Sequence, residues 1–137
     1  MGRIIGIDLG SVRVGLAISD ESETLASGYG FLPFKGYEEL VNKLIEIVRK
    51  ESATGFVVGL PLNMDGSSGK QAAKANKLAH ILHHHSQLPV ILEDERLSTS
   101  EAIDQLHASG KKATKGKTDM VAATVILQAF LDGQQKS

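Results

Sequence analysis

The most conspicuous absence in this sequence is cysteine, and the chain also has no tryptophan and only three prolines. Without cysteine it can form neither a disulfide bond nor a thiolate metal site. No apolar run is long enough to span a membrane, since even the densest stretch, Val121 to Leu131, is too short. A strand-like pattern begins at Arg3 and leaves no room for a signal peptide. We therefore expect a soluble, cytoplasmic protein without a membrane partner.

The sequence also lacks an excess of charge of either sign, because its net charge is −1. It shows no internal repeat, low-complexity tract or linker, so its 137 residues are expected to form one domain over residues 1–137. Positive charge is concentrated in one stretch that resembles a loop and is called the lysine cluster: Lys111, Lys112, Lys115 and Lys117. The cluster is a candidate phosphate contact, and the alternative is an ordinary solvated loop.

Hydrophobic periodicity predicts five strands and four helices. The expected strands cover Arg3 to Asp8, Val12 to Ile18, Leu25 to Phe34, Gly55 to Leu60 and Pro89 to Leu92. The expected helices cover Tyr37 to Glu51, about Ser68 to His85, Ser98 to about Ala108, and a last helix with Thr118 as N-cap that ends near Gly133. This order indicates an α/β fold, with a three-strand antiparallel meander and two parallel strands forming a mixed five-stranded sheet flanked by helices. The last helix is apolar nearly all round and is expected to be buried.

Carboxylates stand at element ends that can converge. Asp8 ends the first strand, Asp94 and Glu95 follow the last strand, and Asp119 is expected in the first turn of the last helix. Sites in α/β sheets gather beyond the carboxyl ends of strands, and helix N-termini stabilise carboxylates. We call Asp8, Glu95 and Asp119 the acidic centre.

Carboxylates that are brought together repel one another, and hard cations such as Mg²⁺ relieve this repulsion through oxygen ligands. Two such ions about 4 Å apart can support phosphodiester cleavage. Each carboxylate also has an ordinary explanation: Asp8 caps a turn, Asp119 serves the helix dipole, and Glu95 pairs with Arg96. The residues alone favour neither hypothesis.

Four groups of segments together resemble the YqgF family, whose members are also called RuvX or Holliday junction resolvases. These are Gly6 to Gly10 with Arg13 to Ala17, then Val57 to Gly66, then Asp94 to Thr99, and finally Asp119 with Ala122-Ala123 and Ile126-Leu127. The match extends over nearly the whole chain in the family's order. The resemblance implies an RNase H-like fold and a hydrolase that cleaves phosphodiester bonds, in bacteria linked to maturation of the 5′ end of 16S ribosomal RNA.

The same resemblance implies the site residues: Asp8, Glu95 and Asp119 as catalytic residues and ligands of Mg²⁺ or Mn²⁺, with two ions expected. Relatives such as RuvC carry an acidic residue at the end of the fourth strand, where this chain has Leu60-Pro61. Glu95 would have to substitute for it, and Asp94 and Asp65 are its competitors.

The remaining candidates are weaker. Asn63 and Asp65 can line the site, but Asn-Met-Asp-Gly is also favourable turn chemistry. Arg13 and Arg96 can bind phosphate bidentately, or Arg96 can pair with neighbouring acids. The run His83 to His85 resembles a metal tract, yet adjacent helical side chains diverge, so a frayed, solvated helix end is the better interpretation.

Two other function classes stay open. Gly-Ile-Asp-Leu-Gly is also a phosphate-loop pattern of the actin, Hsp70 and sugar-kinase superfamily, although these hold ATP between two domains and this chain has the length of one. A non-catalytic nucleic-acid-binding module is the other. We expect a nuclease acting on a ribosomal RNA precursor, with four-way DNA as the alternative substrate, and a monomer or weak homodimer, because strong interface anchors are scarce.

Overall fold

The computed structural model describes residues 2–63, 65–95 and 115–135. Its elements are β1 (Arg3–Leu9), β2 (Arg13–Ser19), β3 (Ala26–Pro33), α1 (Tyr37–Glu51), β4 (Ala53–Leu60), α2 (Lys70–Ser86), β5 (Val90–Asp94) and α4 (Lys115–Gln135). All five expected strands and three of the expected helices are present. The helix expected from Ser98 to Ala108 lies outside the described residues.

The strands form one sheet in the order β3-β2-β1-β4-β5. β2 pairs antiparallel with both β1 and β3, whereas β4 runs parallel to β1 and to β5. The predicted meander with two parallel strands is therefore confirmed. Because β1, β4 and β5 point the same way, their carboxyl ends meet at one end of the sheet.

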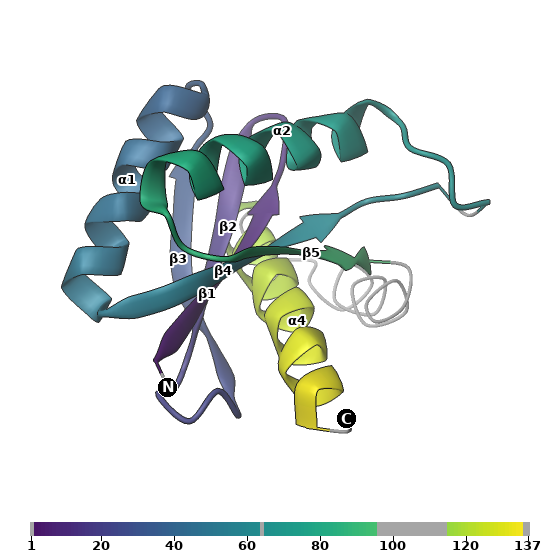
Figure 1. Ribbon diagram of the computed structural model, residues 1–137. Helices are drawn as coiled ribbons and strands as arrows, with labels where there is room; N and C mark the ends of the chain where they lie inside the picture. Colours follow the sequence, from purple (N-terminus) through teal and green to yellow (C-terminus); the bar gives the residue numbers. More distant parts are fainter. Residues whose placement is uncertain (1, 64, 96–114, 136–137) are drawn as a thin grey trace.

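The sheet is covered on both faces, and successive strand residues alternate between them. α1 and α2 pack on one face, which we call the α1/α2 face, and α4 crosses the other, which we call the α4 face (Figure 1). In β1, Ile5, Ile7 and Leu9 belong to the α1/α2 core. Ile4 and Gly6 contact the α4 core instead. Asp8 continues this second set, so the alternation of β1 places it on the α4 face.

The α1/α2 face is built by two amphipathic helices. Leu40, Val41 and Leu44 are the buried residues of α1, as its apolar stripe predicts. Tyr37 at the start of α1 meets the Phe34 ring edge-on and lies under the ammonium of Lys77 from α2. In α2, the run His83 to His85 is exposed, as expected, but the helix continues to Ser86, so this end is not frayed.

The start expected for α4 is wrong, whereas its expected end agrees with the structure. The helix begins at Lys115, not after Thr118, because lysine is a good helix former and one glycine costs only about 1 kcal/mol. Lys115 and Lys117 are therefore helical and do not belong to a loop. The helix ends at Gln135, which is near Gly133 as expected.

The expectation that α4 is buried holds for only one face of the helix. A helix lying on one sheet buries one face, and here the buried apolar residues are Ala122, Ala123, Ile126, Leu127 and Leu131. Val121, Val125 and Phe130 are half-buried. In the described part of the chain, no helix is long and apolar enough to cross a membrane.

Candidate acidic active site

Asp8 lies in surroundings that disfavour the ionised form of its carboxyl group. It lies one residue before the end of β1 on the α4 face, among the apolar residues of the sheet. Burial, followed by the negative charge of Asp119, raises its pKa to about 6. In the absence of a cation, a fraction of the Asp8 carboxyl groups therefore remains protonated near neutral pH.

Asp119 reaches this position because α4 approaches the sheet unusually closely. Gly15 on β2 is the register partner of Asp8 on β1, and a Cβ atom on Gly15 would collide with the carbonyl oxygen of Asp119. Only the absence of a side chain lets the helix backbone lie against β2 there. Asp8 and Asp119 consequently lie close enough for their charges to interact.

Asp119 is paired with Arg13, the first residue of β2. The Arg13 Nε donates a hydrogen bond of 3.0 Å to the Asp119 Oδ2, and both side chains are about 30% exposed (30% and 28%). Because α4 begins at Lys115, Asp119 lies in the second turn, and the expected position in the first turn is wrong. The described structure thus gives Asp119 a guanidinium partner in place of the helix-terminus stabilisation that we expected.

Glu95 also lies on the α4 face, next to β4, whereas Asp119 lies over β2. It follows β5 directly, and its Oε2 lies 3.0 Å from the position a Cβ atom of Gly59 would take. Gly59 faces α4, because the same Cβ position is 2.7 Å from the Ile126 Cδ1. Burial, then the charges of Asp8 and Asp94, raise the pKa of Glu95 to about 7. Glu95 therefore shares a buried electrostatic environment with Asp8.

The alternation of β5 separates the two neighbouring acids that the sequence could not distinguish. Asp94 continues the set of Val90 and Leu92, which pack on the α1/α2 core. Glu93 is the register partner of Gly59 and so lies on the α4 face. Burial, then Asp94, raises the pKa of Glu93. Glu93 is not among the site residues expected from the sequence, although the run Glu-Asp-Glu at a strand end was the available signal.

The carboxylates of the described residues do not form a complete metal-binding site. No group of three His, Cys, Asp or Glu side chains within residues 2–63, 65–95 and 115–135 is arranged to hold one ion. Asp119 instead pairs with a guanidinium. The structure thus brings Asp8, Glu95 and Asp119 into one electrostatic group without assigning them a shared ligand.

Asn63 and Asp65 form a turn that is closed by its own hydrogen bonds. The Asn63 Nδ2 donates to the Ser67 Oγ at 3.0 Å, and the Ser67 N–H donates to the Asp65 Oδ1 at 2.9 Å. Both residues are exposed, in agreement with the turn interpretation. Arg96, Lys111 and Lys112 lie outside the described residues.

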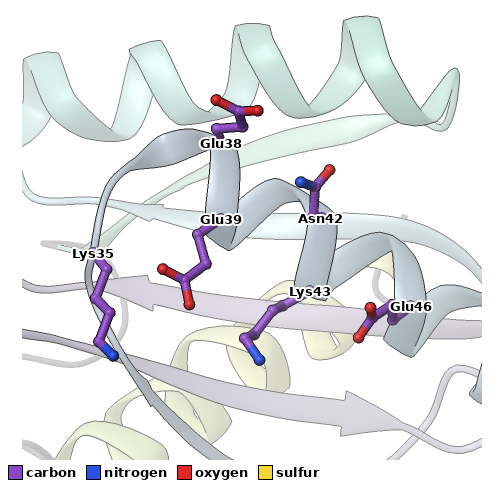
Figure 2. Close-up of a pocket in the computed structure, with 6 residues that line it drawn as sticks. All are labelled: Lys35, Glu38, Glu39, Asn42, Lys43 and Glu46. Carbon is purple, nitrogen blue, oxygen red and sulfur yellow. The ribbon is translucent and has the colours of Figure 1, made fainter.

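A hollow away from the acidic centre lies along the outer surface of α1. Figure 2 shows its lining side chains: Lys35, Glu38, Glu39, Asn42, Lys43 and Glu46. It is open to solvent, and α1 covers the face of the sheet opposite to the acids. The hollow therefore has no part in their chemistry.

Comparison with known proteins identifies the family. Residues 2–133 match the family described as RuvX, Holliday junction resolvase. A relative from Caldanaerobacter subterraneus subsp. tengcongensis, named "Putative pre-16S rRNA nuclease", is 41% identical, with 98% of this chain and 99% of the relative covered. A relative of the same name from Anaeromyxobacter dehalogenans is 43% identical over 95% of this chain and 96% of its own.

A solved structure shows the same fold at low sequence identity. T. thermophilus RuvC in complex with a Holliday junction substrate superposes with a TM-score of 0.64 and 11% identity, covering 100% of this chain and 98% of that one. The expected RNase H-like fold, shared with the RuvC-like resolvases, is therefore confirmed. From its match over almost the whole length, the chain belongs to the RuvX family.

Proposed function

We propose that this protein is a metal-dependent nuclease that hydrolyses phosphodiester bonds in RNA, with Asp8, Glu95 and Asp119 as its catalytic residues. One observation carries the proposal: burial and mutual repulsion raise the pKa of Asp8 to about 6 and that of Glu95 to about 7. Keeping such carboxylates together costs stability, and clusters of this kind concentrate at functional sites. The relatives named as nucleases support the same reaction class.

The chemistry of these residues fits a divalent cation. All three are oxygen donors, and their repulsion is the condition that a cation relieves. We assign Mg²⁺ or Mn²⁺, two ions in all, to Asp8, Glu95 and Asp119, with Asp94 and Glu93 nearby. When bound, such ions activate water and stabilise the leaving oxygen.

The protein's own groups hold this centre in place. Arg13 fixes the Asp119 carboxylate through its hydrogen bond, and Gly15 brings the backbone of α4 against β2. The Arg13 guanidinium also supplies a positive charge beside the acids, where the phosphate of a substrate would lie. Arg96 and the lysine cluster complete the proposed nucleic-acid contacts.

The proposed substrate is a ribosomal RNA precursor, processed at the 5′ end of 16S RNA in the cytoplasm by one domain spanning residues 1–137. The names of the relatives at about 40% identity support this substrate. We propose a monomer or a weak homodimer as the active form.

The test is a cleavage assay on a ribosomal RNA precursor with Mg²⁺ or Mn²⁺ and with a chelator. Asp8→Asn and Asp119→Asn should abolish cleavage, whereas Asp132→Asn, which neutralises an exposed carboxylate at the other end of α4, should cleave normally. Cleavage at the wild-type rate by either active-site variant would refute the assignment. Binding without cleavage by the wild-type protein would favour the non-catalytic module.

Resolution of Holliday junctions is the second candidate, favoured by the family description and the RuvC-like fold. Paired symmetric cuts in a four-way DNA junction require a stable two-fold dimer that presents both sites. Mass measurement by sedimentation at micromolar protein, beside assays on junction DNA and precursor RNA, separates the two. A stable dimer that nicks the junction symmetrically and leaves the RNA intact would establish the resolvase instead.

A further inference from the structure

One row of residues crosses three strands beside the acidic centre. Asp8 on β1 is the register partner of Gly15 on β2, and Gly15 is the register partner of Phe31 on β3. Directly opposed residues share a face of the sheet, so Phe31 also points to the α4 face. With strands about 4.8 Å apart, Phe31 and Asp8 are separated by roughly 10 Å. The start of α4 lies over Gly15 between them.

Phe31 is also the one aromatic residue of this chain whose side chain is exposed. The chain has four phenylalanines and two tyrosines. The other five pack into or against the two cores: Tyr29, Phe34, Tyr37 and Phe56 on the α1/α2 face, and Phe130 on the α4 face. Phe31 alone is more than a third exposed, at 48%. Phe31 is therefore the aromatic ring of this chain that is most accessible to a ligand.

The surroundings of Phe31 indicate what that ligand is. The acidic centre lies on the other side of Gly15 from Phe31. Arg13 lies two residues before Gly15 on the same face of β2, and its guanidinium supplies positive charge. Val12 and Pro33 are exposed at the same end of this strand pair. An aromatic face beside a cationic side chain is the combination with which proteins bind single-stranded nucleic acid, through base stacking and phosphate contacts.

We infer that Phe31 is a stacking platform for an unpaired RNA base next to the phosphate that is cleaved. This inference rests on the proposed function and adds a positioning residue to it. A base in a duplex has both faces covered by its neighbours, so stacking on Phe31 requires a flexible or single-stranded segment. Phe31 thereby directs the acidic centre to unpaired nucleotides.

The first test measures stacking without cleavage. The protein has no tryptophan, so Phe31→Trp introduces the chain's only tryptophan at the platform, and its fluorescence can be excited selectively over that of the two tyrosines. Titration with a single-stranded oligoribonucleotide in EDTA should quench it, and a fully paired RNA duplex should not. The matched control is Leu25→Trp, at an exposed position (63%) beside the turn at the opposite end of β2 and β3. Equal quenching at both positions, or none at Phe31→Trp, would overturn the inference.

The second test measures cleavage of a flexible RNA. Phe31→Leu keeps an apolar side chain on the strand but removes the ring, and we expect KM to rise about five- to hundred-fold with kcat nearly unchanged. Phe31→Tyr should restore the wild-type KM, and Leu25→Ala should not alter it. An RNA without the stacked base should be cut by wild type and Phe31→Leu with equal KM.

The outcomes also separate this inference from the proposed function. If the protein cleaves RNA and Phe31→Leu has the wild-type KM, the platform is refuted and the nuclease remains. If no substrate is cleaved but Phe31→Trp is quenched by single-stranded RNA alone, the nuclease is refuted and the platform remains.

Discussion

At the scale of single residues, Asp8 illustrates how a functional group can oppose stability. Its raised pKa means that the folded protein binds this proton more tightly than the unfolded chain does. The contribution to stability is therefore present at low pH and is lost as the pH rises from about 4 to above 6. The fold retains a charge that it would be more stable without.

Asp8→Asn should accordingly raise the free energy of unfolding by about 1–2 kcal/mol at pH 8 in EDTA, because it removes a poorly solvated charge next to Asp119. The gain should shrink toward pH 4, where Asp8 is protonated in the folded protein. Urea denaturation at both pH values measures it, with Asp132→Asn as control. A variant less stable than wild type at pH 8 would contradict the assigned burial and repulsion.

The ion pair of Arg13 and Asp119 predicts that removing one partner changes the stability of the protein more than removing the other. Arg13→Ala should destabilise the protein, because it leaves Asp119 beside Asp8 without its cation, whereas Asp119→Asn should be nearly neutral. A double-mutant cycle should give a coupling energy of about 1 kcal/mol, since both side chains are partly solvated. Additive effects in thermal denaturation would show that the hydrogen bond contributes nothing in solution.

At the scale of elements, the approach of α4 to β2 positions Asp119. Gly15 carries this contact, since any Cβ atom there meets the helix backbone. Backbone cannot move aside as the tip of a flexible side chain can. The site therefore depends on a residue with no functional group of its own.

Gly15→Ala should destabilise the protein by about 1–3 kcal/mol through overpacking and should reduce cleavage strongly, because α4 must shift and carry Asp119 with it. The matched control is Gly133→Ala near the end of the same helix, where nothing lies within 4 Å of the new atom. This control should gain up to about 1 kcal/mol from helix propensity. Urea denaturation and the RNA cleavage assay read out both variants, and an active, fully stable Gly15→Ala protein would exclude the close approach.

The lysine cluster extends into α4, since Lys115 and Lys117 form part of its first turn. Changing all four lysines to alanine should weaken RNA binding similarly for all sequences and reduce the slope of log K against log salt by up to about 3, at about 0.7 per phosphate contact on single strands. Alanine at Lys35, Lys43 and Lys50 on and beside α1 is the control. Filter binding across salt concentrations gives the slope, and an unchanged slope would make the cluster an ordinary solvated surface.

At the scale of the whole molecule, the acidic centre couples stability to pH and to cations. Asp8 and Glu95 both have raised pKa values, to about 6 and about 7. Between the unfolded and folded pKa values the folded state holds more protons, so this contribution falls as the pH rises. A bound divalent cation replaces those protons and reverses the effect.

The Tm of the protein in EDTA should therefore contain a component that falls between pH 5 and pH 8. Mg²⁺ or Mn²⁺ should raise Tm more at pH 8 than at pH 5, because protons compete with the cation at low pH. Differential scanning calorimetry with and without metal measures both effects, and Asp8→Asn with Glu95→Gln should remove most of each. Equal stabilisation by metal at both pH values, or in that double variant, would place cation binding elsewhere.

Much of this protein can be predicted from sequence, because the period of its apolar residues is a local property. Periodicity identified the five strands and their mixed sheet, and the amphipathic stripe of α1 gave its bounds correctly. Alternation along β1 also suffices to put Asp8 on the face opposite Ile7. These features depend on neighbours in the chain, and so they were predictable before any packing was known.

Contacts between distant segments were decided by the tertiary structure alone. Only the register of β4 with β5 shows that Glu95 and Glu93 share the α4 face while Asp94 does not. Only the path of α4 explains why Gly15 must lack a side chain, and only the pairing of β2 with β3 places the exposed Phe31 in the same row as Gly15 and Asp8. The start of α4 was misplaced for a related reason, since intrinsic propensities near a helix end differ by little and packing settles the boundary. The sequence by itself determined which residues can carry the chemistry; packing across the sheet decided which of them meet.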